Sequence, residues 1–350
     1  MDTIVLKMQG DDKDKEKLKQ AARVLQQGGL VAFPTETVYG LGANGLNPEA
    51  TAKIYQAKGR PSDNPLILHI SRREDLIPLV EGVPPVAEKL MEHFWPGPLT
   101  LILKKSSIVP KRTTGGIDTV AIRMPSHPIA YRLIEEARLP IAAPSANLSG
   151  KPSPTKAEHV IHDLMGRIDV IIDGPRSNIG LESTVVDLTS PIPTILRPGG
   201  ITYEQLKEVI GKVEIDKGIR EDLKEDFRPK APGMKYTHYA PAAPMTIVQG
   251  SRNAVIEKIN KSVEEYLRQG KKAGILATEE TLREYPHGIV LSLGRRDEPE
   301  SIAVNLFDLL RQLDLEGVDV IFAEGVTGDG IGMAIMNRMN KAAGHRIVQV

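Results

Sequence analysis

The sequence predicts an α/β protein whose larger N-terminal domain is a twisted open sheet with helices and whose smaller C-terminal domain is doubly wound and Rossmann-like. Three observations predict it. Short apolar runs typical of strands alternate with amphipathic segments typical of helices. The chain has 350 residues, more than one core usually organises. A stretch with several prolines, 228–244, separates two such series. We therefore expect a first domain over 1–212, a linker or lid over 213–244 and a second domain over 245–350.

The first domain opens with an amphipathic helix over 13–27, because its apolar residues fall mostly on one helical face. A short apolar strand follows at 30–33, and a helix near 48–57 ends at Lys58 and Gly59. Further strands are expected at 66–70, 99–104, 119–123, 141–143, 169–173, 184–188 and 193–197, and helices at 84–94, 127–138, 155–164 and 203–210.

The apolar pattern weakens after about residue 212, and 214–230 is rich in charge. From Met245 a regular alternation begins that is typical of the βα repeat of a parallel sheet. Its strands are expected at 245–248, 273–277, 289–292 and 318–323, and its helices at 252–268, 278–285, 299–313 and 332–343.

The composition argues against several classes of protein. Lys plus Arg and Asp plus Glu are equal at 45 each, which is unusual for a generally basic nucleic-acid-binding protein. Cysteine is absent, which excludes a disulfide framework, a thiolate nucleophile and a cysteine-ligated zinc. The N-terminus is charged rather than a signal region, and no apolar run approaches the ~18 residues of a membrane helix. We expect a cytoplasmic protein that does not enter the membrane.

The stretch KGRPSDNPLILHI, 58–70, places two cations, a hydroxyl and an amide on a Gly/Pro-stiffened turn before an apolar strand. Lys58 and Arg60 are two residues apart, so on an extended turn they can point the same way. A planar guanidinium and a compact ammonium together suit a polyphosphate. The alternative is that Lys58 and Gly59 only cap the preceding helix. For His69, a structural role and a ligand-binding role stay equally open.

Two more polar segments lie where predicted strands end. Thr37 belongs to FPTETVYGLG, which indicates either a ligand pocket at a strand's carboxyl end or a local hydrogen-bonded turn. Arg123 ends an apolar strand and therefore needs an anionic partner or an exposed rim. A substrate carboxylate or a structural aspartate would serve.

The segment PIAAPSANLSG combines small residues, which let backbone amides approach a ligand, with Ser145 and Asn147, which can hydrogen-bond it. A plain Ser/Asn/Gly loop is the alternative. Ser183 and Arg197 repeat the pattern on two later strands. Polar ends on five segments of one sheet predict a single crevice.

Several common motifs are missing. The sequence has no P-loop, no GxSxG elbow and no HExxH metal helix, and no GxGxxG follows a strand in the first domain. In the second domain, GVTGDGIG at 325–332 could cradle a phosphate, but its spacing favours a tight βα turn.

Together these residues resemble a known family. Lys58-x-Arg60 and Ser145-x-Asn147, supported by PTETVYG, are similar to the motifs of the YrdC-domain family of threonylcarbamoyl-AMP synthases. This resemblance implies a YrdC-like sheet in the first domain.

The resemblance covers about residues 10–210, and it is specific because several separated motifs occur in the expected order. PGMKYTHYAP at 232–241 and the smaller α/β domain resemble the long, two-domain branch of the family.

The resemblance implies a reaction in which ATP, L-threonine and bicarbonate or CO2 give L-threonylcarbamoyl-AMP and pyrophosphate. A tRNA-modifying transferase would accept the adenylate and modify the adenosine beside the anticodon. The residues implied around threonine are Thr37, His69, Arg123, Ala143 and Ser183. Those implied around ATP are Lys58, Arg60, Asn64, Thr119, Ser145, Asn147, Ser153, Arg197, Tyr236 and His238, with Lys58 and Arg60 as catalytic residues on the phosphates.

This reaction requires no protein nucleophile, because carboxylated threonine can attack the α-phosphorus itself. We expect catalysis by positioning and charge stabilisation. Mg2+ is expected with ATP although no protein metal cage is visible, since Mg2+ commonly relies on substrate oxygens and water. Tyr236 and His238 lie on the linker, which we interpret as a lid over the nucleotide, with a passive tether as the alternative.

Two rival functions stay open. An RNA-binding module could use the same basic crevice, although zero net charge and few aromatic residues argue against it, and we expect no stable nucleic-acid binding. Another nucleotidyl-transfer or carbamoyl-phosphate-handling enzyme could share the fold.

Overall fold

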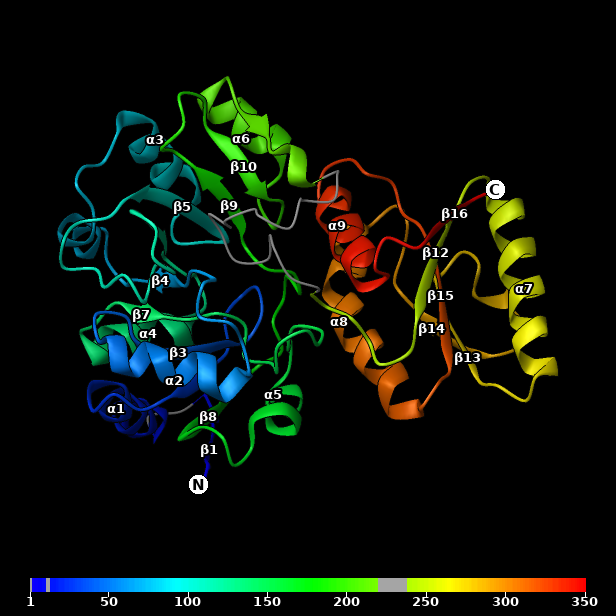
Figure 1. Cartoon of the computed structure of the whole chain (residues 1–350), viewed down its shortest axis with the longest axis horizontal. Helices are drawn as coiled ribbons and strands as arrows, with labels where there is room; N and C mark the ends of the chain where they lie inside the picture. Colours follow the sequence, from blue (N-terminus) through cyan, green and yellow to red (C-terminus); the bar gives the residue numbers. More distant parts are fainter. Residues whose placement is uncertain (1, 11–12, 220–237) are drawn as a thin grey trace. The chain divides into compact units, whose positions relative to one another are not determined.

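The computed structural model describes residues 2–10, 13–219 and 238–350 (Figure 1). Backbone contacts divide the chain into two compact units. The first consists of 1–149 with 153–236, and the second of 150–152 with 237–350. The chain is α/β throughout, as predicted. In the described ranges, no helix is long and apolar enough to cross a bilayer.

The first unit is built on one large twisted sheet with the strand order β1-β8-β2-β3-β7-β4-β6-β5-β9-β10-β11. Its strands are β1 (Ile4–Lys7), β2 (Val31–Phe33), β3 (Gly40–Asn44), β4 (Ile67–His69), β5 (Leu99–Lys104), β6 (Thr119–Arg123), β7 (Ile141–Ala142), β8 (Val170–Asp173), β9 (Thr184–Asp187), β10 (Thr194–Arg197) and β11 (Glu214–Ile215). Its helices are α1 (Lys13–Gln26), α2 (Pro48–Lys58), α3 (Pro85–Phe94), α4 (Pro128–Ala137), α5 (Ala157–Leu164) and α6 (Tyr203–Ile210), with 3-10 turns η1 (Arg73–Leu79) and η2 (Lys217–Ile219).

Helices cover both faces of this sheet. Residues of α1 and α4 share one apolar cluster with Val31 and Phe33 of β2 and with Val170 of β8. Residues of α2, α3, α5 and α6 belong to a larger cluster with the side chains that point to the other face, among them Leu68 and Leu101. The alternation of a strand's side chains between two faces therefore produces two cores and leaves the loops at the strand ends free for polar groups.

Local signals explain why α2 has its observed limits. Asn47 precedes the helix, and its side chain accepts hydrogen bonds from the amides of Glu49 and Ala50. Gly59 follows the helix with φ +62°, a left-handed conformation that glycine adopts readily. These caps place Lys58 in the last turn, at the entrance of the turn that holds Arg60.

The second unit is a five-stranded parallel sheet with the order β14-β13-β15-β12-β16. Within this unit, α7 lies on one side of the sheet and α8 and α9 lie on the other (Figure 1), which is the predicted doubly wound arrangement. Its elements are β12 (Met245–Gln249), α7 (Arg252–Arg268), β13 (Ala273–Ala277), η3 (Leu282–Glu284), β14 (Ile289–Ser292), α8 (Pro299–Glu316), β15 (Val320–Glu324), α9 (Gly332–Ala342) and β16 (Ile347–Gln349).

The sequence-based prediction was wrong at several elements. The helix expected at 278–285 is only the short 3-10 turn η3, because the hydroxyls of Thr278 and Thr281 bond the buried carboxylate of Glu324 in a non-helical loop. Strands β1, β3, β11 and β16 were not predicted. They are short or glycine-rich, and pairing with other strands defines them, as β3 pairs with both β2 and β7.

Candidate active site

The register of the sheet brings together side chains that are far apart in the sequence. His69 at the end of β4 lies opposite Arg123 at the end of β6, and Arg123 also lies opposite Thr100 of β5. On the other side of β4, the amide of Ala143 donates to the carbonyl of Ile67 at 2.9 Å. Because adjacent strands are about 4.8 Å apart, these residues are near enough to contact one small ligand.

Arg123 is the centre of a buried polar cluster. Its Nη1 donates to the Thr37 hydroxyl at 2.8 Å, its Nε donates to the Gly97 carbonyl at 3.3 Å, and its Nη2 pairs with Glu36 Oε1 at 2.7 Å. The Arg123 and Glu36 side chains are 4% and 5% exposed. Burial works against ionisation of Glu36, but Arg123 and the Ser126 amide outweigh it and lower the pKa of that carboxyl. The pair is therefore ionised.

His69 is neutral in this environment. Burial lowers the pKa of His69 to about 3, and the nearby positive charge of Arg123 adds to the effect. Its Nδ1 lies 3.2 Å from the Ile67 carbonyl, which can only accept, so this contact requires the proton on Nδ1. The Ile141 backbone also lies within reach of the ring and, like Ile67, favours a proton on it. The tautomer with its proton on Nδ1 satisfies Ile67 and leaves Nε2 as the acceptor.

Ser183 and Arg197 are also joined. Arg197 Nη2 donates to the Ser183 hydroxyl at 3.1 Å and its Nε donates to the Ser183 carbonyl at 3.0 Å. The Ser183 hydroxyl lies 2.7 Å from that of Thr100. Gly199 lies two residues after Arg197, and a Cβ added to it would come within 2.3 Å of the Glu182 carbonyl oxygen. The glycine thus lets two backbone segments touch beside the buried arginine.

Lys58 is 3% exposed, and it binds backbone oxygens. Its Nζ donates to the carbonyls of Ser145 and Asn147, each at 2.5 Å. The Ser145 hydroxyl in turn donates to Asn147 Oδ1 at 2.6 Å. The predicted motifs Lys58-x-Arg60 and Ser145-x-Asn147 are therefore in contact, because Lys58, the last residue of α2, hydrogen-bonds the loop after β7. The prediction that Lys58 binds phosphate stays a prediction.

The loop after β7 also runs beside the loop that carries Thr37. The amide of Leu41 donates to the Pro144 carbonyl and the amide of Ala146 donates to the Tyr39 carbonyl, both at 2.8 Å. These bonds place residues 145–147, the SAN loop, against β3, the strand that follows Thr37. The segment that carries Thr37 and the SAN loop are therefore packed side by side.

Arg60 and Asn64 lie on the turn between α2 and β4. Arg60 is partly exposed, and its Nη2 is 3.4 Å from the Pro65 carbonyl. Asn64 is fully buried, yet neither its Oδ1 nor its Nδ2 meets a hydrogen-bond partner in the part of the chain that the structure describes. A buried amide without partners costs about 1–3 kcal/mol per polar atom, so this turn is suited to a ligand that supplies them.

Two predicted ATP residues have different positions. Ser153 is fully buried, and its hydroxyl donates to Glu182 Oε1 at 2.5 Å. Glu182 directly precedes Ser183 in the chain. Thr119 begins β6, opposite Lys104, about 13 Å from Arg123 at a rise of ~3.3 Å per residue. It therefore lies outside the cluster around Arg123.

Neither of the two predicted linker residues lies in the described part of the first unit. Tyr236 lies outside the described residues. His238 belongs to the second unit, where its ring lies 5.6 Å from that of Tyr239.

A family model described as "Telomere recombination" (Sua5_yciO_yrdC) matches residues 23–199, and one described as "Threonylcarbamoyl-AMP synthase, C-terminal domain" (Sua5_C) matches residues 201–344. The chain belongs to the Sua5/YciO/YrdC family. The match to the second model places it in the two-domain Sua5 branch, as the resemblance implied.

Relatives extend this similarity over nearly the whole chain. The threonylcarbamoyl-AMP synthase of Bacillus subtilis is 53% identical, with 95% of this chain and 94% of that protein covered. The synthase of Pyrococcus abyssi is 52% identical over 95% of this chain and 96% of its own length. The crystal structure of P. abyssi Sua5 complexed with L-threonine covers all of both chains, with 50% identity and a TM-score of 0.93.

Sequence reasoning missed several members of the buried site of this Sua5-type chain. Glu36 was passed over because it lies between two threonines in a turn and its cationic partner is distant in sequence. Thr100 lies inside an apolar run, and Glu182 only becomes notable through its short bond to Ser153. A carboxylate next to predicted site residues was the available signal for both acids.

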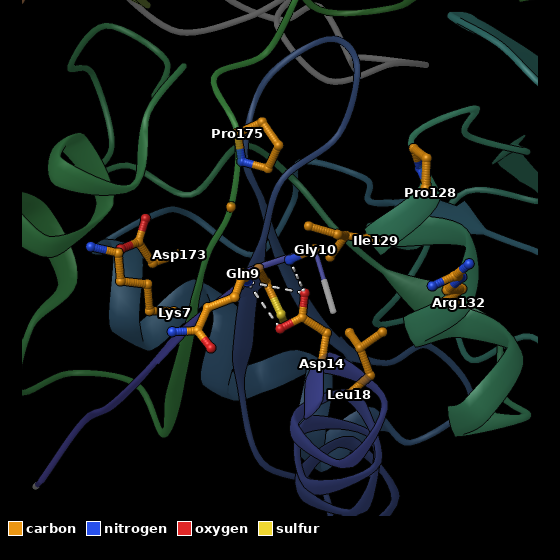
Figure 2. Close-up of a pocket in the computed structure, with 12 residues that line it drawn as sticks. Lys7, Gln9, Gly10, Asp14, Leu18, Pro128, Ile129, Arg132, Asp173 and Pro175 are labelled. Atoms are coloured by element: carbon orange, nitrogen blue, oxygen red, sulfur yellow. Dashed lines mark hydrogen bonds between the residues drawn. The ribbon is translucent and has the colours of Figure 1, made fainter. Parts of the chain in front are cut away.

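A separate pocket of about 940 Å³ in the first unit contains none of the predicted site residues. Figure 2 shows it between the end of β1, the start of α1, α4 and the segment after β8. Asp14 points toward the chain at Gln9 and Gly10, whose amides donate to its carboxylate at 2.7–3.1 Å (Figure 2). This carboxylate is therefore explained by local structure.

Proposed function

We propose that the protein is an L-threonylcarbamoyladenylate synthase. It joins L-threonine, bicarbonate or CO2, and ATP, and releases pyrophosphate. The observation that carries this proposal is the identity above 50%, over about 95% of both chains, with relatives named threonylcarbamoyl-AMP synthase. The buried polar cluster at the strand ends supports it, because proteins seldom bury so many unpaired or charged groups without a ligand to meet.

On the amino-acid side, Arg123 offers guanidinium N–H groups for the threonine carboxylate, and neutral His69 offers Nε2 as an acceptor for the threonine hydroxyl. Thr37, Ser183 and the backbone of Ala143 complete the set. Crystals of the P. abyssi relative contain L-threonine, which supports a threonine site on this chain.

On the nucleotide side, we assign the triphosphate to the turn that carries Arg60 and Asn64, whose buried amide lacks partners in the described residues. Lys58 contributes by hydrogen-bonding the SAN loop, which fixes the positions of Ser145 and Asn147 beside the nucleotide. We also propose ATP contacts for Thr119, Ser153 and Arg197 of the first unit.

The chemistry follows from position rather than from a protein nucleophile. A carbamate oxygen of N-carboxythreonine attacks the α-phosphorus, the P–O bond to the β-phosphate breaks, and pyrophosphate leaves with its electron pair. Buried cations stabilise the charge that builds up on the phosphates. The closely packed strand ends exclude water from the mixed anhydride.

Mg2+ is proposed to accompany ATP. Among the residues that the structure describes, no group of three or more His, Asp or Glu side chains is arranged to hold a metal ion. We propose that triphosphate oxygens and water carry Mg2+, the usual arrangement for this ion. When bound, it would neutralise phosphate charge, while Arg60 orients the chain of phosphates.

The product is a labile adenylate, so a second enzyme must consume it. We propose a cytoplasmic tRNA-modifying transferase that places the threonylcarbamoyl group on the adenosine beside the anticodon. The names of the relatives support this at the level of the adenylate.

The test is pyrophosphate release from ATP and Mg2+, with threonine and bicarbonate omitted in turn. Release that requires both, and that falls at least tenfold in Arg60→Ala while the exposed control Arg72→Ala on η1's flank stays within twofold, supports the synthase. Release without threonine would indicate a different acceptor. If folded protein releases none but binds RNA with steep salt dependence, the RNA-binding function is the better account.

A further inference from the structure

Glu36 has one carboxylate oxygen in use and one without a donor. Its side chain is 5% exposed. Oε1 pairs with Arg123 Nη2 at 2.7 Å and accepts the Ser126 amide at 3.1 Å. Oε2 is buried and meets no hydrogen-bond donor in the described part of the chain. Because the lowered pKa keeps this carboxyl ionised, the second oxygen calls for a donor from elsewhere.

The neighbouring hydroxyls cannot supply that donor. Thr35 Oγ1 donates its single hydrogen to the Val38 carbonyl at 2.7 Å. Thr37 Oγ1 lies 2.8 Å from Thr35 Oγ1 and therefore donates to it, while accepting from Arg123. Both threonine protons are committed within the loop. His69 is neutral with its proton directed at the Ile67 carbonyl.

Arg123 nevertheless keeps donors for a ligand. A guanidinium has five N–H groups, and here the contacts described are to the Gly97 carbonyl, the Thr37 hydroxyl and Glu36. A cation with spare donors and an anion with a spare acceptor thus lie side by side in a buried place. That arrangement is complementary to the zwitterion of an α-amino acid, whose carboxylate and ammonium are also adjacent.

We propose that Glu36 Oε2 binds the α-ammonium of the amino-acid substrate, while Arg123 binds its carboxylate. The inference rests on the proposed function and deepens it: Glu36 selects an amino acid over the analogue that lacks the α-amine. A merely positioning role, in which Glu36 only holds Arg123, makes a different prediction, because it would affect every carboxylate ligand alike.

The experiment measures, by isothermal titration calorimetry, binding of L-threonine and of 3-hydroxybutanoate, which keeps the carboxylate and hydroxyl but lacks the amine. In Glu36→Gln we expect L-threonine affinity to fall at least 20-fold and 3-hydroxybutanoate affinity to change less than threefold. Glu49→Gln, an exposed acid in the first turn of α2, is the matched control. ATP affinity should not change in either variant.

Equal weakening of both ligands in Glu36→Gln would overturn the proposal in favour of positioning through Arg123. If that variant does not fold, the unaltered protein still decides: 3-hydroxybutanoate should bind at least 20-fold more weakly than L-threonine, and a loss below threefold overturns the proposal. Failure of the unaltered protein to bind L-threonine at all would instead count against the proposed function.

Discussion

Lys58→Met tests whether the last residue of α2 acts through the protein or directly on phosphate. Methionine keeps most of the apolar stem but removes the ammonium that holds the carbonyls of Ser145 and Asn147 at 2.5 Å. Hydrogen bonds to a charged group contribute about 1.5–3 kcal/mol each. Because Lys58 is 3% exposed, water cannot easily replace them. We expect the unfolding free energy to fall by about 3–6 kcal/mol if the two bonds act independently.

The assay is urea unfolding followed by fluorescence of Trp95 in the first unit, with ATP affinity measured by calorimetry on the folded variant. Lys53→Met is the matched control, since Lys53 lies on the same helix but is exposed and, among the described residues, donates to the Gly28 carbonyl. It should cost less than about 1 kcal/mol. If Lys58→Met lost no more stability than this control while ATP affinity collapsed, the clamp would be refuted and direct phosphate binding favoured.

Three further predictions concern separate parts of the chain. In the unfolded state His69 takes up a proton below pH ~6.5, whereas in the folded state it stays neutral down to about pH 3. The free energy of unfolding should therefore fall by roughly 1 kcal/mol per pH unit between these values. Urea unfolding at pH 7, 6 and 5 should show this fall, and His69→Gln should lack it. Gly199→Ala should destabilise by about 1–3 kcal/mol, seen in the same assay, since its Cβ would press on backbone at 182–184. Tyr285→Phe removes a 2.6 Å bond to buried Glu324 and should lower the thermal stability of the second unit by about 1.5–3 kcal/mol, measured by calorimetry; no change would show that the carboxylate is satisfied without it.

Much of the fold could be predicted from local patterns because some segments carry their own limits. The strands Leu99–Lys104 and Thr119–Arg123 were predicted at their observed bounds, since each is an apolar run with clear ends. Strand β3 could not be predicted, because GLGAN reads as flexible backbone. It is a strand because its glycines permit close pairing: a Cβ on Gly42 would come within 2.8 Å of both Ile141 and Phe33.

The candidate site divides in the same way. Ser145 and Asn147 were visible because small polar residues interrupt an apolar strand. The partner that Lys58 binds was not visible, since a motif of two cations suggests phosphate and says nothing of a buried carbonyl 87 residues away. Glu36 was missed for the same reason: its meaning depends on Arg123, which only the sheet register brings near. Chemistry that depends on long-range pairing cannot be read from residue types alone.

The buried polar groups at this edge of the first sheet support the ligand site proposed there. A buried ion pair such as Glu36–Arg123 seldom adds stability over apolar side chains of the same size, because both charges lose their water. Neutral His69 adds a cost on acidification. Selection for stability alone would have replaced such groups. Their concentration at these strand ends supports the proposal that a ligand charged at both ends, such as an amino acid, binds there.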